Sequence, residues 1–124
     1  MLRPYVAAAA LLVTAGCAGV PTEPSGSVMA GPAIQAADAA CEPKFADRTL
    51  TSLAALAECQ RDVALPLQQR DAPGLADMYR GLWRDKIALY ARVDRGELTR
   101  AAADRAIAIE ADNWLTNIRS ARRV

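Results

Sequence analysis

The chain has 124 residues, with 15 basic and 14 acidic side chains and no histidine. A chain of this length forms one small domain at most once a targeting segment is removed. Its nearly balanced charge provides no strong attraction to nucleic acid, and the lack of histidine removes the commonest general base and metal ligand. We therefore expect no nucleic-acid partner, no metal site and no small-molecule cofactor.

The beginning of the chain has the layout of an export signal. Arg3 supplies a positive charge, residues 6–13 are uninterruptedly apolar, and the sequence Ala-Gly precedes Cys17. The apolar run is too short to cross a bilayer, which needs roughly 20 residues. This segment resembles the signal peptide and lipobox of bacterial lipoproteins, although Thr14 stands where leucine is commonest. An ordinary signal peptide, cut near the same place and leaving no lipid, is the alternative.

The resemblance implies where the protein works. Residues 1–16 would be removed as a lipoprotein signal peptide, and Cys17 would carry a diacylglycerol and an amide-linked acyl chain. Two or more acyl chains give stable membrane anchoring, whereas one gives only marginal anchoring. Ala18 stands where an aspartate would favour retention in the inner membrane. The resemblance therefore implies a lipid anchor in the outer membrane, facing the periplasm.

Residues 17–44 are expected to be the lipidated cysteine and a flexible linker. The part from residue 18 to residue 31 is rich in Gly, Pro and Ser, and it has too little apolar surface to offset the entropy of ordering. Residues 32–41 are rich in alanine and are compatible with a short helix. Pro43 biases the residue before it toward an extended conformation and would end that helix.

Residues 45–124 are predicted to form the helical domain, which begins with a helix capped by Asp47. Leucine and alanine recur at helical spacing from there to about Ala64. Pro66 is expected to end or kink this helix, because proline lacks an amide hydrogen and clashes with the preceding turn. Residues 67–72 would then be a connector.

Two further helices follow, from Pro73 to about Asp94 and from Arg100 to about Ser120. Gly96 suits the left-handed position after the first, and Thr99 suits the cap of the second. The apolar residues of the first cover nearly half its circumference, so it should be central: Leu75, Met78, Tyr79, Leu82, Trp83, Ile87, Leu89, Tyr90 and Val93. The stripe of the second is Ala103, Ile107, Ala111, Trp114 and Ile118.

Helices joined by so short a loop lie antiparallel. We therefore predict an all-α fold, a compact three-helix domain built on an antiparallel helical hairpin, with the first helix on the other side of the central one. The hairpin register pairs residues equally distant from the turn: Leu75 with Ile118, Tyr79 with Trp114, and Leu82 with Ala111.

Cys41 and Cys59 are predicted to form a structural disulfide. If Cys17 is lipidated, these two remain as an even pair in an oxidising compartment, 18 positions apart. A disulfide closing such a loop stabilises a fold by about 3 kcal/mol in the chain-entropy model. Metal binding would need more ligands, and thiol catalysis would need a nearby base; the sequence indicates neither.

Lys86 and Glu110 interrupt the apolar stripes of the two hairpin helices. Their positions bring them within side-chain reach and indicate a buried ion pair, because charged groups on core faces are usually paired. A polar site that grips a partner between the helices is an alternative, and so is a lysine that extends to the rim.

The sequence contains no motif of a known catalytic site, so we expect a non-enzymatic protein with no catalytic residues. Beyond its signal, the chain resembles small helical periplasmic lipoproteins of unknown function. The leading hypothesis is a protein-binding or envelope structural module with an unknown envelope protein as partner. One alternative is a pilotin-like secretion accessory lipoprotein, which an apolar groove between helices would favour. Another is an enzyme with an unrecognised carboxylate site, which a pocket of pKa-shifted carboxylates would favour.

Overall fold

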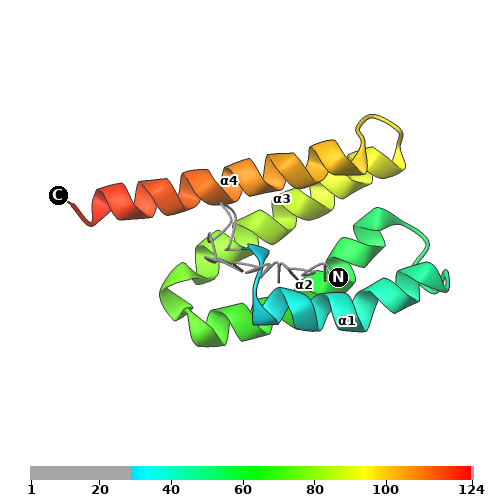
Figure 1. The fold of residues 1–124 in the computed structure, drawn as a ribbon, viewed down its shortest axis with the longest axis horizontal. Helices are drawn as coiled ribbons and strands as arrows, with labels where there is room; N and C mark the ends of the chain where they lie inside the picture. Colours follow the sequence, from blue (N-terminus) through cyan, green and yellow to red (C-terminus); the bar gives the residue numbers. More distant parts are fainter. Residues whose placement is uncertain (1–28, 124) are drawn as a thin grey trace, which may run out of the picture.

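The computed structural model describes residues 29–123, and this part of the chain consists of helices and short connections (Figure 1). The elements are α1 (Pro32–Ala46), α2 (Leu53–Asp71), a short 3-10 turn η2 (Pro73–Leu75), α3 (Ala76–Asp94) and α4 (Arg100–Ala121). No strand occurs within residues 29–123, so the all-α prediction is confirmed for them. The predicted signal peptide, Cys17 and most of the predicted linker lie outside the described residues.

Helix α1 belongs to the folded domain, although most of it was assigned to the linker. It packs along α2, and both Ala37 and Cys41 on its inner face are fully buried. Pro32 stands in its first turn, where the missing amide hydrogen is not needed. Pro43 lies within its last turns and does not end it. Residues 29–123 therefore form four α-helices where three were predicted, and α1 packs on the domain that was expected to begin at residue 45.

Helix α2 begins later than predicted. Ser52 is its N-cap, and the side chain accepts a hydrogen bond from the amide of Ala55 at 3.0 Å. Asp47, the predicted cap, instead follows the last residue of α1. Both residues have side chains suited to capping, so the choice between them depended on where α1 ends.

A carboxylate from α3 also caps α2. Asp94 accepts hydrogen bonds from the amides of Leu53 and Ala54, at 2.9 and 3.0 Å. The first amides of a helix have no partner within the helix and favour negative charge. Asp94 thus ties the C-terminal end of α3 to the N-terminal end of α2.

Helix α2 continues through Pro66 to Asp71, so the connector predicted for residues 67–72 is wrong. Pro66 is exposed, and water can reach the carbonyl group that loses its amide partner there. Beyond it, Gln68 is buried and its Oε1 accepts a hydrogen bond from the indole nitrogen of Trp83 on α3, at 2.8 Å. This buried contact holds the last turns of α2 against α3.

The predicted turn between the last two helices is confirmed. Helix α3 ends at Asp94, and Gly96 adopts a positive φ of 74°, a conformation that glycine tolerates without strain. Thr99 caps α4 by accepting a hydrogen bond from the amide of Ala102 at 3.1 Å. The two helices therefore form a short-looped antiparallel hairpin (Figure 1).

The core of the hairpin shows its register. Leu82 and Ala111 are buried in one cluster, and Leu75, Tyr79 and Ile118 pack against it. The residues predicted to pair, Leu82 with Ala111 and Leu75 with Ile118, thus belong to or pack against the same cluster. Trp114 is 40% exposed and is not among the residues of the cluster, whereas Leu115 is. The face predicted for α4 is therefore correct except at Trp114, whose place against the cluster is taken by Leu115.

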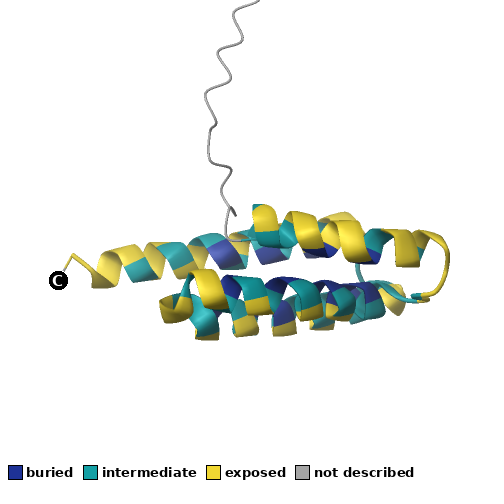
Figure 2. Ribbon diagram, turned by 90° about the horizontal axis from the view of Figure 1, so that it is seen from below, coloured by how far each residue is buried: buried dark blue, intermediate teal, exposed yellow. Residues whose placement is uncertain are grey.

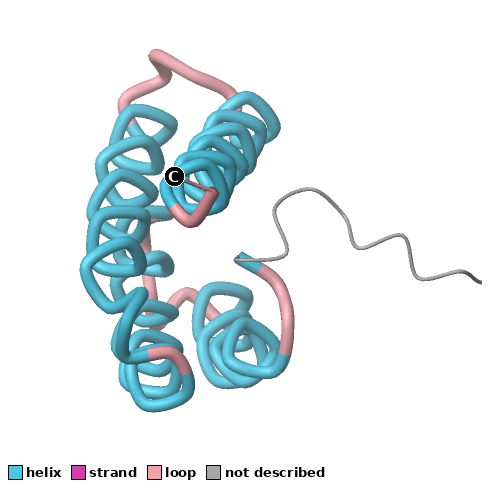
Figure 3. Tube along the Cα trace, turned by 90° about the vertical axis from the view of Figure 1, so that its left-hand side faces the viewer, coloured by secondary structure: helices cyan, strands magenta, loops and turns pink. Residues whose placement is uncertain are grey.

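The four helices form an open arrangement. Helix α3 packs against both α2 and α4, as expected of the central helix, and α1 packs on α2. Viewed end-on, α1 and α4 lie on the same side of the α2–α3 pair, and the segment before α1 enters between them (Figure 3). Buried residues line the surfaces where the helices face one another, and exposed residues cover the outside (Figure 2). A site can form between α1 and α4.

Candidate functional site

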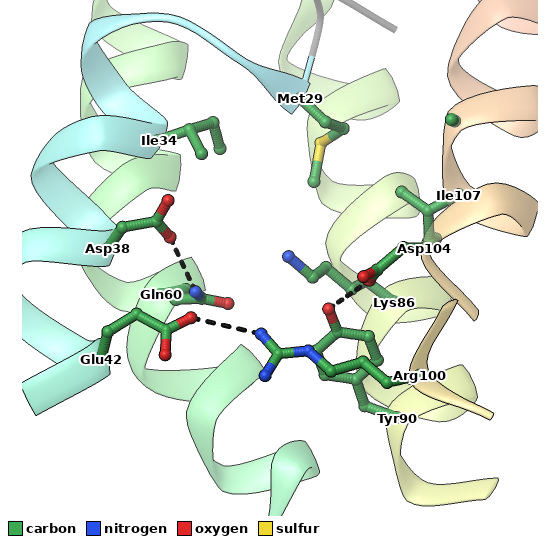
Figure 4. A pocket seen from close by; sticks show the side chains of 11 residues that line it. Met29, Ile34, Asp38, Glu42, Gln60, Lys86, Tyr90, Arg100, Asp104 and Ile107 are labelled. Carbon is green, nitrogen blue, oxygen red and sulfur yellow. Dashed lines mark hydrogen bonds and ion pairs between the residues drawn. The ribbon is translucent and has the colours of Figure 1, made fainter. Parts of the chain in front are cut away.

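A groove runs between α1 and α4, with its floor on α2 and α3. Its volume is about 310 Å³. We call it the groove; its lining residues are Met29, Ile34, Asp38, Glu42, Gln60, Lys86, Tyr90, Arg100, Asp104, Ile107 and Ala108 (Figure 4). Pockets of this size are in the range that holds small ligands or short segments of a partner.

The two walls arise from helical periodicity. Residues three or four positions apart lie on the same face of a helix. Ile34, Asp38 and Glu42 form such a row on α1. A corresponding row on α4 comprises Arg100, Asp104, Ile107 and Ala108. Each wall therefore combines charged and apolar side chains.

Lys86 projects from α3 into the groove. Its ammonium lies 5.1 Å from the ring centroid of Trp83 and 5.2 Å from that of Tyr90, distances typical of cation–π interactions. Burial lowers the pKa of Lys86, and the carboxylates of Asp104 and Asp38 oppose this shift. None of the ion pairs among the described residues includes Lys86. The groove thus holds a largely desolvated positive charge with no carboxylate in contact.

Gln60 projects from α2 beside it and is only 3% exposed. Its Nε2 donates a hydrogen bond to Asp38 at 2.8 Å, whereas its Oε1 is buried with no partner. The reverse orientation of the amide is unfavourable, because an ionised carboxylate only accepts hydrogen bonds. The amide oxygen is therefore left without a donor in the groove.

The remaining charged groups of the groove have partners in contact. Arg100 bridges the two walls by an ion pair with Glu42 at 3.2 Å and lies 5.7 Å from the ring centroid of Tyr90. The hydroxyl of Tyr90 donates a hydrogen bond to Asp104. Burial, and then this hydrogen bond, raise the pKa of Tyr90. These contacts hold the walls at one end of the groove.

The predicted disulfide between Cys41 and Cys59 is present and supports one wall. The two Cα atoms are 5.9 Å apart, within the usual range for a disulfide. The bond joins the middle of α2 to the part of α1 that carries Asp38 and Glu42. Its structural role therefore extends to the groove.

The predicted ion pair between Lys86 and Glu110 is wrong. Burial first, and then the neighbouring carboxyl group of Asp85, raise the pKa of Glu110 to about 7. Interaction with Glu110 lowers the pKa of Asp85. The apolar stripe of α3 faces two neighbouring helices, so its centre faces the groove. Lys86 lines the groove, whereas Glu110 is not among the lining residues, and no ion pair joins the two among the described residues.

Sequence reasoning missed most of the groove. Asp38 and Glu42 stand four positions apart, which is the signal of one helix face, but they fell in the range assigned to the linker. Gln60, Arg100 and Asp104 occupy ordinary polar positions, and their convergence depends on how the helices pack. Lys86 was singled out, but its surroundings were not predicted. Cys17, the proposed lipidation site, lies outside the described residues.

Neither a metal-binding cluster nor a membrane span is found in residues 29–123. No group of three or more His, Cys, Asp or Glu side chains in this range is suitably placed to hold a metal ion. Its helices are all too short or too polar to cross a membrane. The chain matches no protein-family model, no curated protein and no solved structure.

Proposed function

We propose that the protein is a lipoprotein of the bacterial envelope, anchored by a lipid on Cys17 in the outer membrane and facing the periplasm. The Ala-Gly-Cys sequence at the end of a short apolar run supports this proposal. The disulfide between Cys41 and Cys59 is consistent with it, because such bonds persist in exported proteins and are rare in the cytosol of most bacteria.

Within the envelope, the protein acts without catalysis as a module that binds another envelope protein. The groove is the observation that carries this proposal, because it is concave and its floor presents polar groups that lack partners. The carboxyl with the raised pKa, on Glu110, is paired with Asp85 and is not among the residues that line the groove. An acid–base site is therefore less well supported than a docking site.

The polar floor also distinguishes this proposal from a pilotin-like function. A pilotin-like protein was expected to have an apolar groove, whereas Gln60 and Lys86 occupy the floor here. The groove suits a partner that offers hydrogen bonds and charge together with apolar contacts. We therefore place the general docking function first.

Lipidation is tested by labelling cells with a fatty acid. The wild-type chain is expected to incorporate the label, and Cys17→Ser is expected to abolish incorporation and release the protein from membranes. Ser25→Ala is the control, because it changes a residue beyond the lipobox and leaves Cys17 and the disulfide unchanged. Wild-type protein found entirely soluble in the periplasm would contradict the anchor.

Docking is tested by photo-crosslinking in intact cells. A photoreactive side chain at Ala108, which lines the groove, is expected to give a discrete product with a partner protein. The control position is Ala88, which is exposed on α3 and is not among the residues that line the groove. Equal products at both positions, or none at either, would contradict docking in the groove. A secretin subunit crosslinked at Ala108 would instead favour the pilotin-like alternative.

A further inference from the structure

Two polar groups in the groove are largely buried and lack an ion-pair or hydrogen-bond partner among the described residues. The ammonium of Lys86 contacts two aromatic rings but forms no ion pair among the described residues. The Oε1 atom of Gln60, in a side chain 3% exposed, accepts no hydrogen bond. Both side chains line the same cavity and come from adjacent helices (Figure 4).

Both groups are unfavourable as they stand. A buried acceptor without a donor keeps the full cost of losing water, and a desolvated charge is stabilised by an opposite charge in contact. The structure compensates the other polar groups nearby: Asp38 accepts from Gln60, Asp104 accepts from Tyr90, and Glu42 pairs with Arg100. A ligand must therefore supply a negative charge for Lys86 and a hydrogen-bond donor for Gln60 Oε1.

The complement is a carboxylate placed next to an N–H donor. The carboxylate would contact Lys86, and the N–H would donate to Gln60 Oε1. A simple anion that has no hydrogen-bond donor, such as acetate, would leave the amide oxygen without a donor, and a simple cation would meet the ammonium of Lys86. The acidic residues Asp38 and Asp104 are exposed, so solvent screens their repulsion of a carboxylate.

We propose that the groove binds the C-terminal end of a partner polypeptide, with its terminal carboxylate on Lys86 and its last backbone N–H on Gln60. Every polypeptide end except one that finishes in proline carries this pair of groups, and capture of a chain terminus is a recurring mode of peptide recognition. This inference rests on the proposed docking function and names the part of the partner that the groove holds.

The apolar lining fits the last side chains of such an end. Met29 and Ile34 stand on the α1 side, and Ile107 stands on α4 (Figure 4). Met29 also packs against the clusters that contain Leu82 and Trp83, so it lies at the junction of the two helix pairs. Apolar final residues are expected to bind better than acidic ones, because Met29, Ile34 and Ile107 offer them apolar contacts and would desolvate an additional charge without pairing it.

The first test compares a free carboxylate with an amide. The probes are a mixture of acetylated tripeptides randomised at the last two positions, and the same mixture with C-terminal amides. They are added to the full chain carrying Cys17→Ser and 13C-labelled at its two lysines, Lys44 and Lys86. Lys44 is exposed at the end of α1 and serves as the internal control.

The acid mixture is expected to shift the NMR signal of Lys86 and to raise its pKa, because a carboxylate stabilises the charged form. The signal of Lys44 should not change. The amide mixture should bind about tenfold more weakly than the acid mixture, as expected for loss of a charged hydrogen bond. No shift at millimolar acid peptide, or equal shifts by both mixtures, would overturn the proposal. Equal shifts by the acid mixture and by acetate alone would mean that the groove binds simple anions, which would also overturn it.

The second test concerns Gln60 and uses a peptide whose last N–H is replaced by an ester oxygen. The ester should bind about fivefold more weakly than the matching peptide acid, because Gln60 Oε1 loses its donor. In Gln60→Met the two ligands should bind equally. Equal binding to the wild-type chain would overturn the assignment of Gln60.

These tests separate the inference from the docking function. Crosslinking at Ala108 together with no response to acid peptides would mean that a partner docks through an internal segment, so the inference fails and the function stands. Peptide binding without a crosslinked partner in cells would overturn the docking function while retaining the chemistry of the groove.

Discussion

The disulfide between Cys41 and Cys59 is expected to hold α1 in the fold and thereby to maintain one wall of the groove. Helix α1 contributes two fully buried residues, Ala37 and Cys41, so its apolar contribution is small. Replacing both cysteines by alanine removes the cross-link and leaves α1 attached by these contacts and by the loop to α2.

The magnitude follows from the loop that the bond closes. The cysteines are separated by 18 positions. The chain-entropy model gives about 3 kcal/mol for a loop of this size. For a domain of this length, each kcal/mol changes the melting temperature by about 4–8 °C, so the double substitution is expected to lower it by roughly 12–24 °C.

The assay is thermal unfolding followed by circular dichroism, on chains that also carry Cys17→Ser. Cys17→Ser alone is the control, and adding a reductant to it should reproduce the effect of the double substitution. Amide exchange should show that the amides of α1 lose protection before those of α3 and α4. A decrease of less than about 5 °C would refute the chain-entropy argument, since it would correspond to roughly 1 kcal/mol.

Three further outcomes are expected. In the wild-type chain, stability should fall as pH rises from about 4.5 to about 7, because the folded-state pKa of Glu110, about 7, exceeds its unfolded value of 4.5. Glu110→Gln should remove this decline. The effect should stay below about 1 kcal/mol because solvent screens the site; equal pH profiles of both proteins in urea titrations would contradict it. Asp94→Ala should lower stability by about 1 kcal/mol through loss of the cap on α2, whereas Asp112→Ala, away from any helix start, should not. Gln68→Leu should cost about 1–3 kcal/mol by leaving the indole nitrogen of Trp83 unpaired, and an unchanged urea midpoint would contradict this.

The turn between α3 and α4, which is determined by nearby residues, was predicted correctly. Gly96 and Thr99 act on the backbone within a few residues of themselves, so the turn and the start of α4 could be read directly. The disulfide could also be predicted, because removing Cys17 leaves one possible pair. The cap of α2 was predicted at Asp47 but lies at Ser52, because α1 extends to Ala46 and Asp47 follows it.

The beginning of α1 and the continuation of α2 through Pro66 were not predictable in this way. The alanines of α1 favour a helix whereas its prolines do not, so local preference left this segment open, and the burial of Ala37 and Cys41 against α2 stabilises the helix. Similarly, the last turns of α2 are stabilised by the contact between Gln68 and Trp83, two residues 15 positions apart. Burial and distant partners outweighed local propensity at both places.

The sequence alone determined the helical class, the hairpin of α3 and α4, and the pairing of Cys41 with Cys59. Only the tertiary structure decided that α1 and α4 lie on the same side of α2 and α3 and leave a groove between them. It also decided that Lys86 faces Gln60 and two aromatic rings, while Glu110 meets Asp85. The physical reason is that periodicity specifies which residues share a helix face, whereas the partner of that face depends on how all the helices pack.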